Sequence, residues 1–248
     1  MSAAFGRRPV TGLLLIASAV LSVVGYVVLG TRFDWPAVLD EPGTTALDKY
    51  VAAEQAIRAG FYVMALSSLV LIPAAFGLQA AITRDHTAAR VVTAFGVLGA
   101  FAQLLGWLRW PITMPSVADS WVAAQGDPIA ETAVATSYDV LNTYAGGALG
   151  EHLGWLLQGV WAVGVFVIGL RAVGLPRWVS VIGLALSAVW AVLVPVGTAL
   201  GNGVLEFWGL NVYTGWYVWL IVLGVVLIAR RVGPPADDSA AITAGGVS

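Results

Sequence analysis

Long apolar stretches without interior charge dominate the pattern of the chain. A membrane-spanning helix needs about 20 mostly apolar residues, and six stretches reach that length. Their apolar positions do not alternate with a period of two, which disfavours a transmembrane β-barrel. The pattern therefore predicts an all-α, polytopic transmembrane bundle of six helices. The predicted spans are roughly 10–30, 60–82, 89–110, 149–170, 178–198 and 212–229.

The distribution of Arg and Lys predicts how these helices are oriented, because bases accumulate in the cytoplasmic flanks of spanning segments. If six helices cross, eight bases fall on one side with three acids, and four bases fall on the other with eleven acids. The eight bases are Arg7, Arg8, Arg84, Arg90, Arg171, Arg177, Arg230 and Arg231. We therefore expect both termini in the cytoplasm of a bacterium, with the protein in its cytoplasmic (inner) membrane.

Composition agrees with this prediction and excludes several classes of protein. The chain is 59% apolar and 10% charged, whereas soluble domains are about 25% charged. A net charge of −2 offers no basic face for nucleic acid. The chain has no cysteine, so it lacks thiolate metal sites, iron–sulfur ligands and disulfides. The one lysine, Lys49, lies outside the predicted spans, which excludes a retinal Schiff base within a helix.

Domain organisation is simple in this prediction. Residues 1–232 form one six-helix transmembrane domain, and residues 233–248 form a cytoplasmic tail whose small, polar and proline residues are typical of disorder. A cleaved signal peptide is the alternative for the first helix. Its apolar run is about twice as long as a usual signal core, which favours a retained helix.

The predicted outer connections are much longer than the cytoplasmic ones. They cover 31–59 and 111–148, and long connections on a rigid scaffold often carry function. Residues 46–57 have the spacing of an amphipathic helix that continues into the second span. Asp127 and Pro128 resemble an N-cap followed by a proline at the first helical position, so a helix should begin there.

Polar residues of helices three and four can be matched by depth. At 1.5 Å per residue, Gln103 and Gln158 each lie about 20 Å from the cytoplasmic arginine of their helix. Arg109 and Glu151 both lie about 28–30 Å from it. Consecutive helices are usually neighbours, so we expect Gln103 to meet Gln158, and Arg109 to meet Glu151 or His152.

Aromatic and polar residues gather in the outer half of the predicted bundle. On helix four, Tyr144, Glu151, Trp155 and Gln158 share one face at α-helical spacing. Such a lining suits a pocket that holds an apolar ligand and orients its polar end. The candidate ligand-binding residues are Arg109, Asn142, Tyr144, Trp107, Trp155, Gln103 and Gln158. The alternative is an interfacial belt, since Trp and Tyr collect at membrane interfaces in any helical bundle.

Three titratable residues are the candidates for acid–base chemistry, namely Asp139, Glu151 and His152. Neighbouring residues on an α-helix point about 100° apart, so Glu151 and His152 need not converge. The chain lacks the paired histidine and Glu-x-x-His spacings of metal sites, so we expect no metal. We expect no cofactor either.

One segment resembles a known family. It contains Gln158-Gly159-Val160-Trp161, then Gly174-Leu175-Pro176-Arg177-Trp178 and Val181-Ile182-Gly183. An apolar helix, a Gly-x-Leu-Pro-Arg-like turn and a glycine-containing helix are similar to an uncharacterised family of six-helix bacterial integral membrane proteins, filed as a domain of unknown function. The resemblance implies six helices and no established activity, and no catalytic residue is carried over from it.

These observations leave three functions open. The first is a protein with an outward-facing aromatic and polar pocket, which binds an apolar or lipid-like small molecule or serves as an accessory subunit of a membrane protein partner. The second is a membrane-embedded enzyme that uses acid–base chemistry on a lipid or isoprenoid-like substrate. The third is a small-solute transporter. Membrane lipids are expected partners in each case, and nucleic acid in none.

Overall fold

The computed structural model describes residues 7–82, 86–171 and 175–229, and all the regular structure in these residues is helical. The predicted tail, 233–248, and the bases Arg84, Arg230 and Arg231 lie outside the described residues. The elements are α2 (Arg7–Arg32), η1 (Ala37–Asp40), α3 (Gly43–Ala52), α4 (Glu54–Ile82), α5 (His86–Ile112), α6 (Met114–Ala124), α7 (Pro128–Leu141), η2 (Asn142–Leu153), α8 (Gly154–Gly169), α9 (Arg177–Leu200) and α10 (Gly203–Ala229).

Six helices in the described part of the chain are long and apolar enough to cross a membrane, as the sequence predicted. A helix satisfies its backbone hydrogen bonds internally, which a chain in hydrocarbon must do. All six are longer than the predicted spans, and the third and fourth exceed them by the most. The third continues from α5 into α6 as far as Ala124, and the fourth runs without interruption from Pro128 to Gly169.

The helices form a closed ring in which neighbours in the chain are neighbours in space. The packing order is α2, α4, α5, α8, α9 and α10, and α10 packs again on α2. Glycine makes this last contact possible. A Cβ atom placed on Gly12 would lie 2.5 Å from the carbonyl oxygen of Gly224, so the backbones of α2 and α10 approach closely only because both positions lack a side chain.

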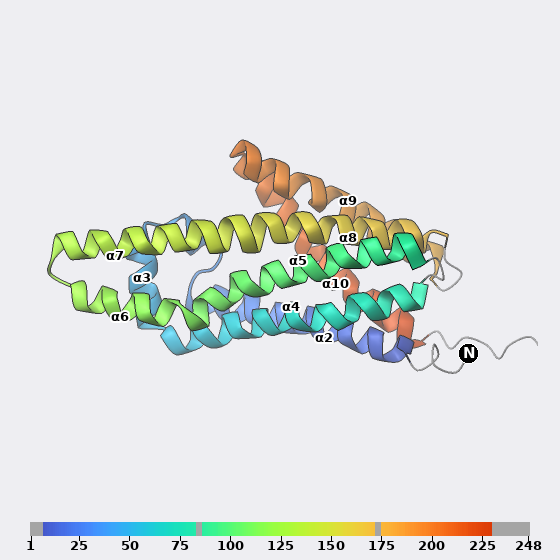
Figure 1. Ribbon diagram of the computed structural model, residues 1–248, viewed down its shortest axis with the longest axis horizontal. Coiled ribbons are helices and arrows are strands. Elements are labelled where there is room, and N and C mark those ends of the chain that lie inside the picture. The colour runs from blue at the N-terminus through green and yellow to red at the C-terminus, as the bar shows by residue number, and fades with distance from the viewer. Residues whose placement is uncertain (1–6, 83–85, 172–174, 230–248) are drawn as a thin grey trace, which may run out of the picture.

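One end of the bundle extends beyond the ring. There α6 and α7 form a hairpin, and α3 lies across it (Figure 1). We call this the hairpin end, and the opposite end, where α2 begins and α10 ends, the terminal end. Asp127 accepts hydrogen bonds from the N–H groups of Ile129 and Ala130, which confirms the predicted helix start at Pro128.

The prediction of a helix over 46–57 is wrong in one respect. It does not continue into the second span, because the backbone breaks at Ala53 (φ −136°) between α3 and α4. The break lets α3 turn away from the bundle axis and bury Leu47 and Tyr50 against the hairpin end. Apolar spacing alone did not reveal this change of direction.

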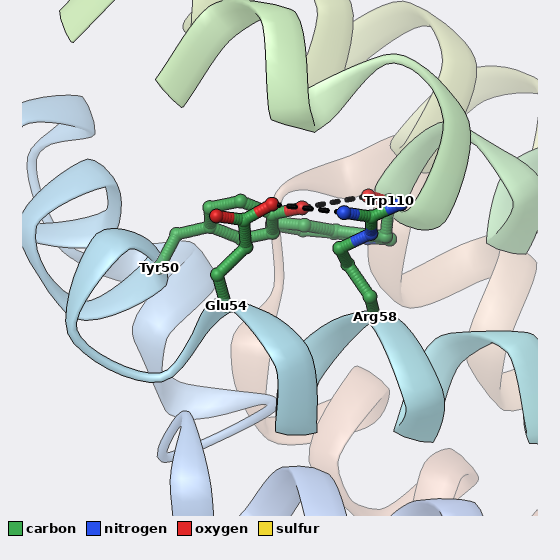
Figure 2. Close-up of polar contacts among 4 residues, drawn as sticks. All are labelled: Tyr50, Glu54, Arg58 and Trp110. Atoms are coloured by element: carbon green, nitrogen blue, oxygen red, sulfur yellow. Dashed lines mark hydrogen bonds and ion pairs between the residues drawn. The ribbon is translucent and has the colours of Figure 1, made fainter. Parts of the chain in front are cut away.

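An aromatic core fills the hairpin end. Phe61 stacks on Trp110 with ring centroids 4.6 Å apart, and Phe33 meets Trp110 edge to face at 5.0 Å. The hydroxyl of Tyr50 donates a 3.0 Å hydrogen bond to the carbonyl oxygen of Trp110 (Figure 2). The bond joins α3 to α5 beside the exposed ion pair of Arg58 and Glu54. A second core, rich in tryptophan, lies inside the ring.

Candidate functional site

A cleft of about 540 Å³ lies beside the hairpin end, where α5, η2, α9 and α10 meet η1. Its volume is within the range of pockets that hold small molecules. It combines charged, polar and apolar side chains from six separate elements, since Trp155 of α8 also lines it. The lining residues are Leu39, Arg109, Asn142, Thr143, Gly147, Ala148, Glu151, His152, Trp155, Thr198, Ala199 and Glu206.

The wall that η2 contributes depends on its π-helical winding over Asn142–Leu153. On an α-helix, Asn142 and Glu151 would lie about 180° apart and face opposite ways. A π-helix has about 4.4 residues per turn, so nine residues make close to two full turns. Asn142 and Glu151 therefore line the same cleft. π-helical segments are rare and are frequent at functional sites.

Arg109 forms the floor of the cleft and is only 5% exposed. Its guanidinium donates hydrogen bonds to the carbonyl oxygen of Gly106 (2.7 Å) and to Oδ1 of Asn142 (2.8 Å). It also lies 5.0 Å from the ring centroid of Trp110. The expected pairing with Glu151 or His152 is not formed as an ion pair. In residues 7–82, 86–171 and 175–229, the ion pairs within 4.0 Å are Lys49–Asp34 and Arg58–Glu54 alone.

Two carboxylates and one imidazole face the cleft above Arg109. Glu151 and His152 come from η2, and Glu206 comes from the first turn of α10. Glu206 accepts a 3.3 Å hydrogen bond from the hydroxyl of Thr198 at the end of α9. Nδ1 of His152 is buried and has no hydrogen-bond partner among the described residues. These groups are available to a ligand.

The predicted contact between Gln103 and Gln158 is confirmed. Nε2 of Gln103 donates to Oε1 of Gln158 at 3.1 Å, and the hydroxyl of Tyr213 completes the cluster by bonding to both amides at 2.8–2.9 Å. Both glutamine side chains are almost completely buried. Trp155 separates this cluster from the cleft, with its ring 6.1 Å from that of Tyr213. The two glutamines therefore join α5 to α8 behind the cleft wall.

Three predicted site residues lie elsewhere. Tyr144 is 71% exposed and lines a separate surface hollow on α7, because π winding turns it away from the face of Glu151. Trp107 packs in the aromatic core against Trp35 and Phe61. Asp139 is exposed on α7, next to Gly43 of α3, and is not part of the cleft lining. Of the acid–base candidates, the structure brings together only Glu151 and His152.

The cleft also contains residues that sequence reasoning did not select. They come from the turn between α9 and α10 and from η1, and are Leu39, Thr198 and Glu206. Glu206 lies before the predicted sixth span, 212–229, and the structure places it in the first turn of α10, where it is the single acid of that helix. Its placement beside η2 depends on the ring arrangement, which the sequence pattern did not give.

The chemistry of the lining is that of hydrogen bonding and charge. Within the described residues, no group of three or more His, Cys, Asp or Glu side chains is placed to hold a metal ion. The cleft offers one guanidinium, two carboxyl groups, one imidazole, an amide and two hydroxyls, next to the ring of Trp155. Such a set can bind the polar end of a molecule whose remainder is apolar.

The ring of long apolar helices defines the class of this molecule, a multi-pass integral membrane protein. The chain belongs to the family described as a domain of unknown function, DUF4386, which it matches over residues 10–224. This agrees with the resemblance seen in the sequence. Comparison with curated proteins and with solved structures gave no match.

Proposed function

We propose that this protein binds an amphiphilic, lipid-like molecule in the cleft between α5, η2, α9 and α10. The observation that carries the proposal is the cleft itself. It has about 540 Å³ of space and places Arg109, Glu151 and His152 opposite apolar side chains. An amphiphile needs polar and apolar side chains close enough together to contact its two ends at the same time.

The polar lining supports a functional role because it is costly in a membrane. Ionisable side chains within spanning helices are rare and usually mark a binding or transport pathway. Here Arg109 and Glu151 belong to the third and fourth long helices. Both face the cleft rather than the outer surface of the ring. A purely interfacial belt would place such groups toward bulk water.

The apolar surroundings support entry from the lipid. The tip formed by the end of α9 and the start of α10 exposes large apolar side chains, among them Leu200, Val204, Phe207 and Trp208. Thr198, Ala199 and Glu206, which belong to the same tip, line the cleft. We propose that the tail of the ligand lies along this tip while its polar end occupies the cleft.

We also propose the orientation and the membrane. In the full sequence, the bases of the predicted cytoplasmic flanks outnumber those of the other side by eight to four. The positive-inside rule then places the terminal end and both termini in the cytoplasm. The protein would lie in the cytoplasmic membrane of a bacterium, as a single domain over residues 1–232. The cleft would take its ligand from the outer leaflet.

A second candidate function is acid–base catalysis on the bound amphiphile. It is favoured by one observation, the placement of Glu151 and His152 in the same cleft. Asp139 has no part in it, because that side chain lies on the surface of α7. Turnover of the bound molecule that is lost in Glu151→Gln, with ligand still retained, would establish this function.

Native mass spectrometry of the full chain, extracted gently from its own membrane, tests the binding proposal. Two glycines provide a matched pair of variants, because a Cβ atom on Gly147 or Gly215 would meet no other atom within 4 Å. Gly147 lines the cleft, and Gly215 does not. We expect a stoichiometric amphiphile on the wild type and on Gly215→Phe, and its loss from Gly147→Phe.

Two results would overturn the proposal. One is a wild-type protein that carries no small molecule, and the other is equal retention by the wild type and both variants. If Gly147→Phe does not fold, Ala148→Leu fills the same cleft from an exposed position. Equal retention by that variant would count against the proposal in the same way.

A further inference from the structure

The charges around the cleft are unequal. Glu151 and Glu206 line the cleft together with Arg109, which supplies the one Lys or Arg group of that lining. Two carboxyl groups thus share the cleft with one guanidinium. The other three bases of the hairpin end do not compensate for this excess, because Arg32, Lys49 and Arg58 are not among the residues that line the cleft. Two of them also have their own acidic partners, since Lys49 pairs with Asp34 and Arg58 with Glu54. The cleft therefore attracts positive charge.

The hydrogen bonds of Arg109 further reduce its capacity to attract an anion. Each of its two terminal nitrogens donates one hydrogen bond, to Gly106 and to Asn142, and the guanidinium lies 5.0 Å from the ring centroid of Trp110. The residue as a whole is only 5% exposed. Arg109 therefore connects α5 with η2, instead of presenting a free guanidinium to a phosphate or carboxylate.

The carboxyl groups of Glu151 and Glu206 have fewer protein partners than the guanidinium of Arg109. Glu206 has one hydrogen bond, the long one from Thr198, and it comes within 4.0 Å of no base in the described residues. Glu151 likewise has no basic side chain within 4.0 Å in that part of the chain. Both side chains are partly exposed to the cleft. An ammonium group that entered would meet two carboxyl groups without displacing a basic partner.

Trp155 adds a surface that suits the same group. Trp155, in the first turn of α8, is one of the residues that line the cleft. The face of an indole ring attracts a cation through its quadrupole, and tryptophan does so most strongly among the aromatic residues. Carboxylates beside an indole form a common arrangement for binding organic cations, and they gain strength where water is excluded.

From these observations we infer that the ligand is an amphiphile with a cationic amine headgroup. The ammonium would lie between the carboxylates of Glu151 and Glu206 and against the ring of Trp155, and its alkyl tail would lie along the α9–α10 tip. This inference rests on the proposed function, since it specifies the ligand of the same cleft.

The test compares three probes of equal chain length on the full protein in nanodiscs of zwitterionic lipid. The probes are dodecylamine, dodecanol and dodecanoate at neutral pH, and displacement of a fluorescent fatty amine reports binding. Gly147→Phe, with its cleft filled, gives the background due to lipid. We expect dodecylamine to bind at least about tenfold more tightly than dodecanol, a difference that one favourable charge contact can supply.

Charge-neutral variants then locate the site. Glu151→Gln and Glu206→Gln keep the shape of the side chain, and each should weaken dodecylamine binding about tenfold while dodecanol binding stays the same. Asp119→Asn, an exposed acid on α6, is the control and should bind as the wild type does. Thermal unfolding of each variant shows whether it folds, and the dodecanol affinity provides a second check.

The outcomes separate this inference from the proposed function. Equal affinity for amine and alcohol, both blocked by Gly147→Phe, would overturn the inference and leave the proposed function standing. Tightest binding of dodecanoate would also overturn it and would return the ligand-binding role to Arg109. Absence of cleft-dependent binding by all three probes, together with a cleft found empty by mass spectrometry, would overturn both.

Discussion

Nη2 of Arg109 donates a 2.8 Å hydrogen bond to Oδ1 of Asn142, and this bond joins α5 to the first turn of η2. Nη1 of the same guanidinium donates to the carbonyl oxygen of Gly106. A buried charge held in this way fixes the distance between the two helices at the floor of the cleft.

Loss of the Arg109 side-chain charge should destabilise the protein. Arg109→Met leaves Oδ1 of Asn142 without its donor, and hydrogen bonds to charged groups contribute about 2 kcal/mol. We expect a lower midpoint of thermal unfolding in detergent for this variant. Arg32→Met is the control, because Arg32 is exposed at the end of α2. Equal midpoints for the two variants would show that the connection between the helices adds nothing to stability.

The contact between Gly106 and Gly150 should tolerate no side chain. A Cβ atom on Gly106 would lie 2.6 Å from the Cα atom of Gly150, and a backbone atom cannot move aside cheaply. We expect Gly106→Ala to lower the free energy of unfolding by about 1–3 kcal/mol, as overpacking usually does. Gly215→Ala meets open space on α10 and should be neutral or slightly stabilising. Denaturant unfolding in mixed micelles measures both, and a neutral Gly106→Ala would contradict the close approach.

The hydroxyl of Tyr50 should contribute about 1 kcal/mol at pH 7, the usual contribution of one hydrogen bond. Tyr50→Phe removes its bond to Trp110, whereas Tyr62→Phe alters a half-exposed ring and serves as the control. Unfolding followed by tryptophan fluorescence compares the two variants. An equal loss of stability in both would mean that the Tyr50 bond is unimportant.

Alkaline pH should weaken the folded state through the same residue. Burial raises the pKa of Tyr50 above its ordinary value of about 10, the carboxylate of Glu54 raises it further, and Arg58 partly opposes this shift. Above pH 10 the unfolded chain therefore releases a proton that the folded chain keeps, so the free energy of unfolding falls by up to about 1.4 kcal/mol per pH unit. The advantage of the wild type over Tyr50→Phe should shrink between pH 10 and 11.5, and an advantage that grows over that interval would contradict the assignment.

Orientation can be measured directly, because the chain has no cysteine. Single cysteines at Ser120, on the exposed surface of α6, and at Ala88, in the first turn of α5, mark the two ends of the bundle. We expect a membrane-impermeant maleimide to label Ser120→Cys in intact cells, and to label Ala88→Cys only after the cells are opened. The reverse pattern would place the hairpin end in the cytoplasm and would exclude a ligand from the outer leaflet.

The spanning helices could be predicted from sequence because the membrane imposes a simple rule. A stretch of about 20 apolar residues crosses as a helix regardless of the details of packing. The depth of a residue in the membrane is also easy to estimate along such a helix, since the rise per residue is fixed. The estimated depths correctly paired Gln103 with Gln158. The break between α3 and α4 depends instead on the burial of α3 against the hairpin end. The spacing of apolar residues in the sequence does not reveal such a contact.

The site was harder to predict because its key feature is a change in helical winding. Counting with α-helical spacing placed Tyr144 beside Glu151, whereas the π winding of η2 places Asn142 there. The sequence also predicted Glu151 or His152 as the partner of Arg109, whereas the guanidinium donates a hydrogen bond to the side-chain amide oxygen of Asn142. Residues of the α9–α10 tip line the cleft because the ring of helices closes. This closure is a property of the whole fold and could not be predicted from local sequence patterns.

The hydrogen bond from Trp121 to Asp48 has a consequence for how the protein is made. It joins α6 to α3 across 73 residues of sequence. A ribosome adds about 5–20 residues per second, so Asp48 is synthesised roughly 4–15 s before Trp121. During that interval Leu47 and Tyr50, which the hairpin end buries, have no α6 or α7 to cover them. Biogenesis thus includes a period in which this apolar face of α3 must be shielded by the membrane surface or by the insertion machinery.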